Sequence, residues 1–263
     1  MTYHNLFSSM WRQYININPT VEKIYKLLKN DNLNLVNDHI AIRSIDLEGL
    51  RVEDLGKYFE KYGYAKMQTY YFEEKKLVAT HFEHSDENAP RVFISHLETK
   101  KFSPYLQDTM HNIFTQVQIK GEELLFSGRS WGGIYHDVYQ KLLKESEYAA
   151  WLYCFGFCAN HFTVNVNSLS KHSSIEELNL YLKEQGYQLS SKGGEVKGSE
   201  EQGLKQSSTL ADPIEINFIE GVFKVPSVYY EFAERFVLPS GHKFSGFVES
   251  SADKIFESTN VKK

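Results

Sequence analysis

Cysteine is scarce in this chain and long apolar runs are missing, which limits the kind of protein it can be. Only two of the 263 residues are cysteines, too few for the disulfide framework of a small secreted domain. No apolar run approaches the ~18 residues that a membrane-spanning helix needs. The Met1 end also lacks a basic segment followed by an apolar one. We therefore expect a cytoplasmic protein with no membrane partner.

Excess positive charge is missing as well. The chain has 29 Lys and Arg residues against 34 Asp and Glu residues, a formal net charge of -5, and the basic residues are scattered. Proteins that bind nucleic acids normally carry a basic patch that neutralises phosphates, so we expect no nucleic-acid partner. The length and the hydrophobic content of 41% suffice for one sizeable core or two small ones and exclude a disordered chain.

The first half of the chain predicts a module with the order βαβββ. Ile40 and Ile42 lie on one side of a predicted strand, and His39 and Arg43 lie on the other. An amphipathic helix follows and ends at Gly63, because glycine readily adopts the left-handed conformation of a helix C-terminus. Three strand-like runs come next, at residues 64–72, 77–82 and 91–95.

The same order recurs in the second half. A strand begins at His161, and the helix after it has Ser174 as its N-cap and ends at Gly186. His161 precedes Gly186 by 25 positions, and in the first module His39 precedes Gly63 by 24 positions. The agreement in order and spacing indicates an internal duplication. Strand-like runs follow near Tyr187 and at 204–209, 214–223 and 228–236, of which one is an extra strand or a hairpin arm. The polar stretch 193–203 is typical of a mobile loop.

These patterns predict an α+β fold, in which two βαβββ modules form a cupped mixed sheet around a metal site, with added outer helices. Asn18 as N-cap and Pro19 at the first helical position predict the second of two N-terminal helices. Helices are also expected at 103–117 and 135–155. The expected parts of one compact catalytic domain are N-terminal helices (1–35), a first module (36–100), a helical insertion (101–158), and a second module with a C-terminal cap (159–263).

The duplication distinguishes His39 and His161 from the other histidines among the ten in the chain. Each lies at the start of a strand, on the face opposite the aliphatic residues. Packing of the two modules with pseudo-twofold symmetry would bring both imidazoles into one cavity. We expect four histidines to be solvated: His4, His84, His172 and His242. Whether the remaining four contact a site is left open, and these are His81, His96, His111 and His136.

The last predicted strand supplies a carboxylate. Glu231 and Glu234 fall on opposite faces of this strand, and either could be exposed. Glu231 is the better metal ligand because it lies in mid-strand between bulky residues, where an unpaired carboxylate would be costly. Two histidines and one carboxylate form the facial triad typical of Fe(II) oxygenases, although zinc or manganese would accept the same ligands.

Arg43 lies four residues after His39 on the same strand face, ~13 Å along the backbone. An arginine that points into a metal-binding cavity would bind an anion, and the fork of its guanidinium favours a carboxylate. The alternative is a salt bridge at the edge of the sheet.

Several segments together resemble the 2-oxoadipate dioxygenase/decarboxylase (hydroxyglutarate synthase) family, and the two modules resemble the vicinal oxygen chelate superfamily. The resemblance runs from about Asn37 to Thr259. It rests on His39–Arg43 (HIAIR), Asn160–Thr163 (NHFT) and Glu231–Arg235 (EFAER), with support from Arg91–Ser95 (RVFIS) and Ala252–Ser258 (ADKIFES).

The resemblance implies that His39, His161 and Glu231 hold Fe(II). It further implies that Arg43, together with His39, binds the substrate and acts in catalysis. Ser245, Gly246 and Phe247 are expected in the wall of the substrate pocket. The implied partners are O₂ and a small 2-oxo dicarboxylic acid. The implied reaction converts 2-oxoadipate and O₂ to 2-hydroxyglutarate and CO₂, a step of lysine catabolism.

Other functions are compatible with the same fold. They are a metal-dependent lyase or isomerase, an extradiol-type dioxygenase acting on another small anionic substrate, and a metal-free binding protein. Three expected ligands favour the oxygenase, because a lyase of this architecture would more often have a fourth. Cys154 and Cys158, four apart on a predicted helix, are expected to be a buried pair rather than a redox or zinc site. The sequence leaves the oligomeric state open.

Overall fold

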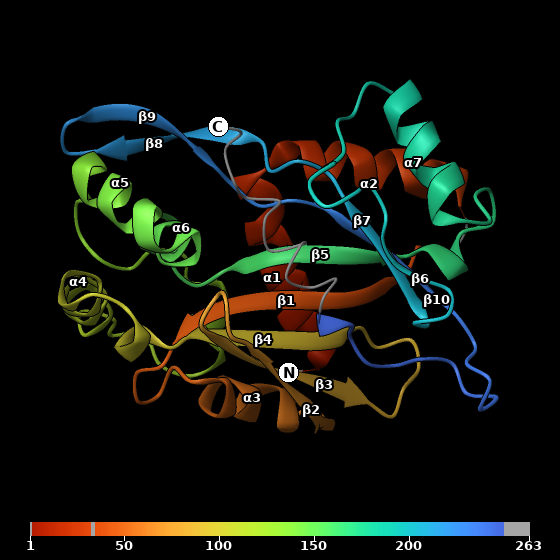
Figure 1. Ribbon diagram of the computed structural model, residues 1–263, viewed down its shortest axis with the longest axis horizontal. Coiled ribbons are helices and arrows are strands. Elements are labelled where there is room, and N and C mark those ends of the chain that lie inside the picture. Colours follow the sequence, from red (N-terminus) through yellow and green to blue (C-terminus); the bar gives the residue numbers. More distant parts are fainter. Residues whose placement is uncertain (1, 33–34, 250–263) are drawn as a thin grey trace.

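A mixed eight-stranded sheet forms the centre of the computed structural model, which describes residues 2–32 and 35–249 (Figure 1). The strand order is β2-β3-β4-β1-β5-β10-β7-β6, and β8 and β9 form a separate two-stranded sheet. The strands are β1 (Asn37–Ile45), β2 (Tyr64–Phe72), β3 (Leu77–His84), β4 (Arg91–Leu97), β5 (Ala159–Asn165), β6 (Lys197–Ser199), β7 (Leu204–Ser208), β8 (Pro213–Phe218), β9 (Gly221–Pro226) and β10 (Glu231–Arg235).

The strand order repeats outward from the junction of β1 and β5. On one side the strands follow in the order β1-β4-β3-β2, and on the other in the order β5-β10-β7-β6. In each half the pair of strands nearest the junction is parallel, which is β1 with β4 and β5 with β10. The remaining neighbouring strands of each half are antiparallel. At the junction β1 and β5 are antiparallel, with His39 opposite Thr163 and Ala41 opposite His161. The predicted α+β class and the duplicated βαβββ order are confirmed, and the two leading histidines lie on neighbouring strands.

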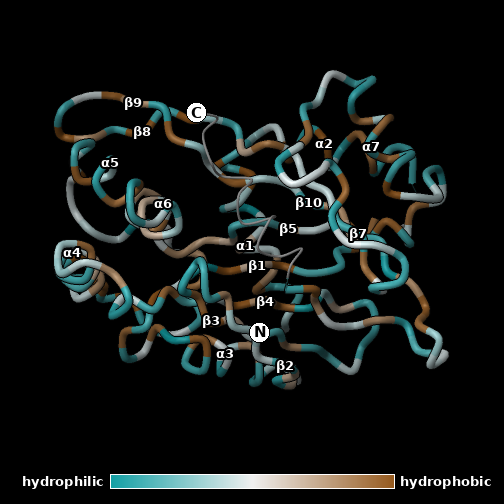
Figure 2. Tube along the Cα trace, viewed as in Figure 1, coloured by the Kyte–Doolittle hydropathy of each residue, from teal (hydrophilic) through white to brown (hydrophobic). Residues whose placement is uncertain are grey.

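Seven α-helices accompany the sheets in the described ranges. They are α1 (Tyr3–Ile17), α2 (Pro19–Asp31), α3 (Val52–Glu60), α4 (Pro104–Phe114), α5 (His136–Glu145), α6 (Glu147–Phe155) and α7 (Ile175–Glu184). Helix α1 packs against β5, where the rings of Trp11 and Tyr14 each lie 5.0 Å from that of Phe162. The apolar side of β5 is therefore covered by helix, which leaves the opposite face for the histidines. Figure 2 shows hydrophobic residues along β1 and β4 in the centre of this sheet.

The start of α2 follows the predicted cap. The Asn18 side chain accepts a hydrogen bond from Thr20 N at 3.0 Å, and its amide donates to Val228 O at 3.0 Å. One side chain thus both caps a helix and joins the N-terminal helices to the residues before β10. Among the described residues, no helix has the length and apolarity needed to cross a membrane.

The helical insertion differs from expectation in two ways. Residues 135–155 form two helices instead of one, because the chain is extended at Ser146, whose hydroxyl accepts from Ala149 N at 3.1 Å and caps α6. Helix α6 is also not external. Its residues 148–155 are all buried, and Trp151 Nε1 donates to Ser227 O at 2.8 Å. The insertion therefore contributes directly to the core.

One further expectation is wrong, and a second is made specific by the structure. The polar stretch 193–203 contains the edge strand β6, and Lys197 within it is buried with its ammonium donating to Ser190 O at 3.3 Å. The apolar run 214–223 is a hairpin, in which β8 and β9 turn before Gly221. A single alternating pattern does not reveal a turn inside it, because both arms continue the same period.

The two cysteines are buried and free, as expected, but they do not share a helix. Helix α6 ends at Phe155, and Gly156 has a φ of +66°, so Cys158 lies beyond the helix. Burial raises the pKa of both thiols well above the usual range, which opposes formation of the reactive thiolate. The described geometry gives them no role in redox chemistry.

Candidate metal centre

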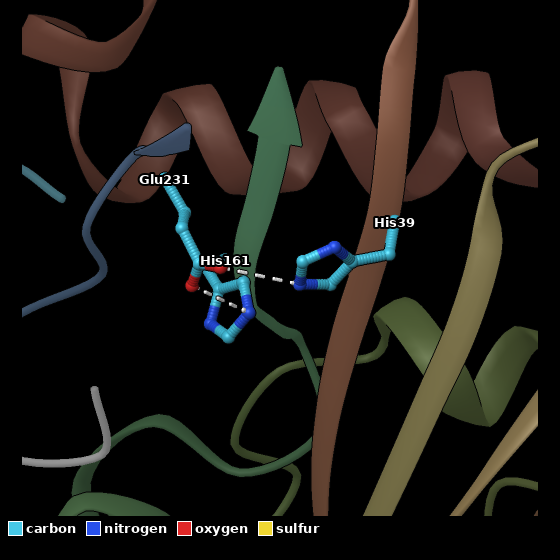
Figure 3. A group of neighbouring side chains, drawn as sticks. All are labelled: His39, His161 and Glu231. Carbon is cyan, nitrogen blue, oxygen red and sulfur yellow. Dashed lines mark ion pairs between the residues drawn. The ribbon is translucent and has the colours of Figure 1, made fainter. Parts of the chain in front are cut away.

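Three side chains from β1, β5 and β10 meet on one face of the sheet (Figure 3). Ligand atoms of His39, His161 and Glu231 all lie within 4.8 Å of one another. The distance from His39 Nε2 to Glu231 Oε1 is 3.4 Å, and that from His161 Nε2 to Glu231 Oε2 is 3.2 Å. All three residues are buried. The structure thus brings together the three residues that were predicted as metal ligands.

Strand register explains why they meet. Thr163 of β5 lies opposite His39 on one side and opposite Glu231 on the other. These three residues form a row across the sheet, and His161 lies two residues before Thr163 and hence on the same face. The Thr163 hydroxyl lies 3.1 Å from His39 Nε2. Convergence therefore requires both the duplication and the pairing of β10 with β5.

Each histidine is oriented by the residue that precedes it. His39 Nδ1 lies 2.8 Å from Asp38 Oδ1, and His161 Nδ1 lies 3.0 Å from Asn160 Oδ1. Because both Nδ1 atoms have oxygen partners, the Nε2 atoms are the ones directed toward Glu231. Oxygen acceptors in this position fix the orientation of a metal-binding imidazole and increase its basicity. Sequence reasoning missed both residues, although each immediately precedes a predicted ligand.

Asp38 also belongs to a buried ionic cluster. Arg235 donates from Nε to Asp38 Oδ2 at 2.7 Å and from Nη2 to Oδ1 at 2.9 Å. The Nη1 atom donates to the carbonyl oxygens of Phe244 and Gly246 at 3.1 and 2.8 Å. Arg91 Nη1 lies 3.6 Å from Asp38. Arg235 therefore connects the first histidine to the segment that follows β10.

The pKa values in the centre follow from burial and mutual charge. Burial lowers the pKa of His161 to about 3, against an opposing effect of the Glu231 charge. Burial also acts to lower the pKa of His39, but Glu231 and the hydrogen bond to Asp38 outweigh it and raise that pKa. For Glu231 and Asp38, burial acts to raise the pKa, yet the neighbouring histidines and, for Asp38, Arg235 lower it overall. The two carboxylates are thus ionised at neutral pH.

The donor set fits a divalent transition metal. Two atoms that bind the same ion at ~2.1 Å lie roughly 3–4 Å apart, and the measured separations of 3.4 and 3.2 Å fall in this range. Glu231 is fully buried, and its Oε2 has no hydrogen bond despite its proximity to His161. Its Oε1 accepts from Gln206 Nε2 at 2.5 Å. A buried carboxylate oxygen without a donor is well suited to a cation.

Arg43 is 1% exposed and lies near the triad, since its charge contributes to lowering the pKa of His161. Its Nη1 lies 3.1 Å from Glu147 Oε1, and its Cζ lies 4.9 Å from the ring centroids of both Tyr148 and Trp151. The guanidinium does form a salt bridge, but with α6 and in the interior, because β1 is a central strand. Substrate binding by Arg43 stays a prediction.

Ser245 and Phe247 lie in the segment after β10. The Ser245 hydroxyl hydrogen-bonds to Glu83, which helps to lower the pKa of that half-buried carboxyl. Phe247 packs its ring against His39 with centroids 4.8 Å apart, and its backbone N–H donates to Tyr70 at 3.0 Å. Of these two residues expected in the pocket wall, Phe247 contacts a member of the triad. The segment Ala252–Ser258, part of the family resemblance, lies outside the described residues.

No other histidine of the described chain joins the triad. His172 was expected in solvent but is 7% exposed and packs on Tyr181 with ring centroids 4.6 Å apart. His84, also expected in solvent, is half-buried and its Nε2 lies 2.9 Å from Tyr62 O. Local polarity did not predict these contacts, because the packing partners come from other elements. Of the histidines that were left open, His81 and His96 are buried.

Comparison with known proteins agrees with this geometry. The chain matches the family 2-oxoadipate dioxygenase/decarboxylase over residues 2–130 and 123–244. It is 36% identical to a chloroplastic 2-oxoadipate dioxygenase/decarboxylase of Arabidopsis thaliana, over 98% of this chain and 77% of the relative.

Two crystal structures are closely similar. One is a Shewanella frigidimarina protein provisionally named a hydrolase, with 43% identity and a TM-score of 0.89 over 94% of this chain and 97% of that chain. The other is hydroxyglutarate synthase from Oryza sativa in complex with 2-oxoadipate, with 33% identity and a TM-score of 0.90 over 98% of this chain and 91% of that chain. The family match spans most of the sequence, and the rice enzyme shares the fold over nearly its whole length. This chain therefore belongs to the 2-oxoadipate dioxygenase/decarboxylase family.

Proposed function

We propose that this protein is a non-haem Fe(II) dioxygenase that converts 2-oxoadipate and O₂ to 2-hydroxyglutarate and CO₂. The observation that carries the proposal is the convergence of His39, His161 and Glu231 in a member of this family. The reaction balances, because one oxygen atom of O₂ enters the new carboxyl group and the other enters the hydroxyl group. A bound Fe(II) would supply the redox chemistry needed to use O₂.

The side chains around the triad would hold the ligands in place. Asp38 and Asn160 would keep the two imidazoles oriented with Nε2 toward the metal, and Gln206 would hold the Glu231 carboxylate through its 2.5 Å hydrogen bond. These contacts involve all three candidate ligands. The described group contains three metal-ligating side chains, a set that favours an oxygenase over a lyase.

Arg43 would bind the carboxylate of the substrate that is farther from the metal. It lies on the strand face of His39, and the rings of Tyr148 and Trp151 hold its guanidinium by cation–π contacts. Glu147 already pairs with this guanidinium, so a substrate carboxylate would share it or displace Glu147. Positioning of this kind selects the carbon that meets the oxidant.

Anaerobic reconstitution with Fe(II), followed by measurement of O₂ uptake and CO₂ release, tests the proposal. Wild type should consume O₂ with 2-oxoadipate and much less with 2-oxohexanoate, which lacks the second carboxylate. Alanine at His39, His161 or Glu231 should remove most of the iron and nearly all activity, whereas His242→Ala, at an exposed histidine, should change neither. A triple variant with stoichiometric iron would refute the ligand assignment.

Arg43→Lys separates the substrate role from the metal role. Lysine keeps the charge but loses the bidentate fork, so iron content should stay unchanged while turnover of 2-oxoadipate falls strongly. If Arg43→Lys turned over 2-oxoadipate as fast as wild type, the basis for assigning a dicarboxylic acid as the substrate would be removed. Participation in lysine catabolism and a cytoplasmic location stay predictions, and the Arabidopsis relative is named as chloroplastic.

A further inference from the structure

Tyr229 is a fully buried tyrosine that faces the metal centre. It lies two residues before Glu231, and its ring centroid is 4.8 Å from that of His161, with an angle of 30° between the planes. Its relative exposure is 0%, and its hydroxyl has no hydrogen-bond partner in the structure. A buried hydroxyl that is left unpaired is costly, so this group calls for a partner that the chain does not provide.

The position of this ring is held by backbone contacts. The carbonyl oxygen of Tyr229 accepts a hydrogen bond from the Tyr14 hydroxyl. The next residue, Tyr230, accepts from Thr209 N at 2.9 Å through its carbonyl and donates from its N–H to Thr209 Oγ1 at 3.0 Å. The backbone at Tyr229 and Tyr230 is therefore anchored, and the Tyr229 ring itself packs on His161.

Charged groups of the centre act on this hydroxyl electrostatically. Burial is the main reason that the pKa of Tyr229 lies well above its usual value; Glu231 and Glu147 raise the pKa further, and Arg43 opposes them. The hydroxyl is therefore within electrostatic reach of both the triad and the Arg43–Glu147 pair. As a neutral phenol it can donate a hydrogen bond to an anion placed between them.

Tyr230 provides an internal comparison. It is equally buried and its hydroxyl also lacks a partner, but it lies on the other face of the strand, where Phe232 and Trp11 have ring centroids 5.5 and 6.0 Å away. An unpaired hydroxyl alone therefore does not mark a binding site. The neighbours of Tyr229 include the groups that are proposed to bind metal and substrate, whereas those of Tyr230 are aromatic side chains such as Trp11, Tyr25 and Phe232.

We infer that the Tyr229 hydroxyl donates a hydrogen bond to the 2-oxo acid end of the substrate, which makes Tyr229 a further substrate-binding residue. This inference rests on the proposed function. The 2-oxo acid end is favoured over the distal carboxylate because the Tyr229 ring lies directly on His161, whereas Arg43 serves the distal end. Glu231 is not the acceptor, since the hydroxyl is not hydrogen-bonded to it.

Tyr229→Phe and the matched control Tyr230→Phe test the inference, because each removes one buried hydroxyl and keeps the ring. Binding of 2-oxoadipate and of 2-oxohexanoate to the Fe(II)-loaded proteins would be measured anaerobically by calorimetry. Tyr229→Phe should weaken binding of both acids by a similar factor of about 10- to 100-fold, the value of a hydrogen bond to a charged group. Tyr230→Phe should change it less than about 2-fold, and iron content should be unchanged in both variants.

Each other outcome overturns the inference in a distinguishable way. Unchanged binding of both acids to Tyr229→Phe would show that the hydroxyl donates no hydrogen bond to the substrate. Loss of iron in this variant would show that the hydroxyl supports the metal centre instead of the substrate. A loss confined to 2-oxoadipate places the hydroxyl at the distal carboxylate, and an equal loss in Tyr230→Phe indicates a general packing effect. A wild type that binds iron but neither acid overturns the proposed function, and this inference with it.

Discussion

Replacement of Asp38 by asparagine removes the charge at the centre of the buried cluster that supports His39. Asp38 accepts two hydrogen bonds from Arg235 at 2.7 and 2.9 Å and lies 2.8 Å from His39 Nδ1. Asp38 and Arg235 are 2% and 3% exposed. Asparagine keeps the shape of the side chain, but it leaves the guanidinium buried without its counter-charge. It also presents an amide donor where an acceptor is required.

The expected cost follows from this burial. Breaking a buried ion pair by removing one partner typically lowers the free energy of unfolding by about 3–5 kcal/mol. We expect the lower end for Asp38→Asn, about 3 kcal/mol, because asparagine retains one acceptor oxygen. Removal of both charges in Asp38→Asn/Arg235→Met should cost less than the sum of the two single changes, with a coupling of about 2 kcal/mol.

Urea unfolding of the metal-free protein, followed by far-UV circular dichroism, measures these changes. The exposed Asp108→Asn is the control and should stay within about 0.5 kcal/mol of wild type. Loss of an oriented imidazole should also weaken Fe(II) binding by about 10- to 100-fold in Asp38→Asn. A stability loss below about 1 kcal/mol, or simple additivity with Arg235→Met, would refute the reasoning.

The pH dependence of this variant has a definite sign. The pKa of Asp38 is lower in the folded protein than in the unfolded chain, because Arg235 and His39 outweigh the opposing effect of burial. Its contribution to stability is therefore fully present above the unfolded pKa of ~3.9 and is lost as the pH falls below it. The difference in stability between wild type and Asp38→Asn should shrink below about pH 4. It should also decrease above about pH 6.5, because Asp38 raises the pKa of His39 and this contribution is lost as His39 releases its proton.

Three further predictions concern packing. Gly156→Ala should lower the free energy of unfolding by about 2–5 kcal/mol in urea, because φ is +66° and the new Cβ would lie 2.3 Å from a backbone carbonyl oxygen. Gly186→Ala, at φ +86° in open space, should cost only about 1–2 kcal/mol, and equal losses would contradict the steric argument. Asn18→Ala should cost about 1–3 kcal/mol in the same assay, since it removes a helix cap and a buried hydrogen bond, and no loss would contradict this. Cys154 and Cys158 should react with a thiol reagent only after unfolding, so rapid labelling of the native protein would be the contrary result.

The sequence by itself determined the features that depend on near neighbours. The cap at Asn18, the helix start at Ser174 and the left-handed glycines at 63 and 186 are all where local chemistry placed them. Alternation located β1 and β5, and the repeated spacing identified the duplication. Because the duplication sets His39 and His161 in equivalent positions, the amino-acid pattern alone was enough to name both as candidate ligands.

Only the tertiary structure decided which side chains meet across the sheet. Arg235 binds Asp38 over a separation of 197 residues, and Arg43 pairs with Glu147 over a separation of 104. The burial of α6 and the strand inside the polar stretch 193–203 were likewise not visible in the sequence. The physical reason is that periodicity tells which face of an element a residue occupies, whereas its partners depend on strand order and register between segments far apart in the chain.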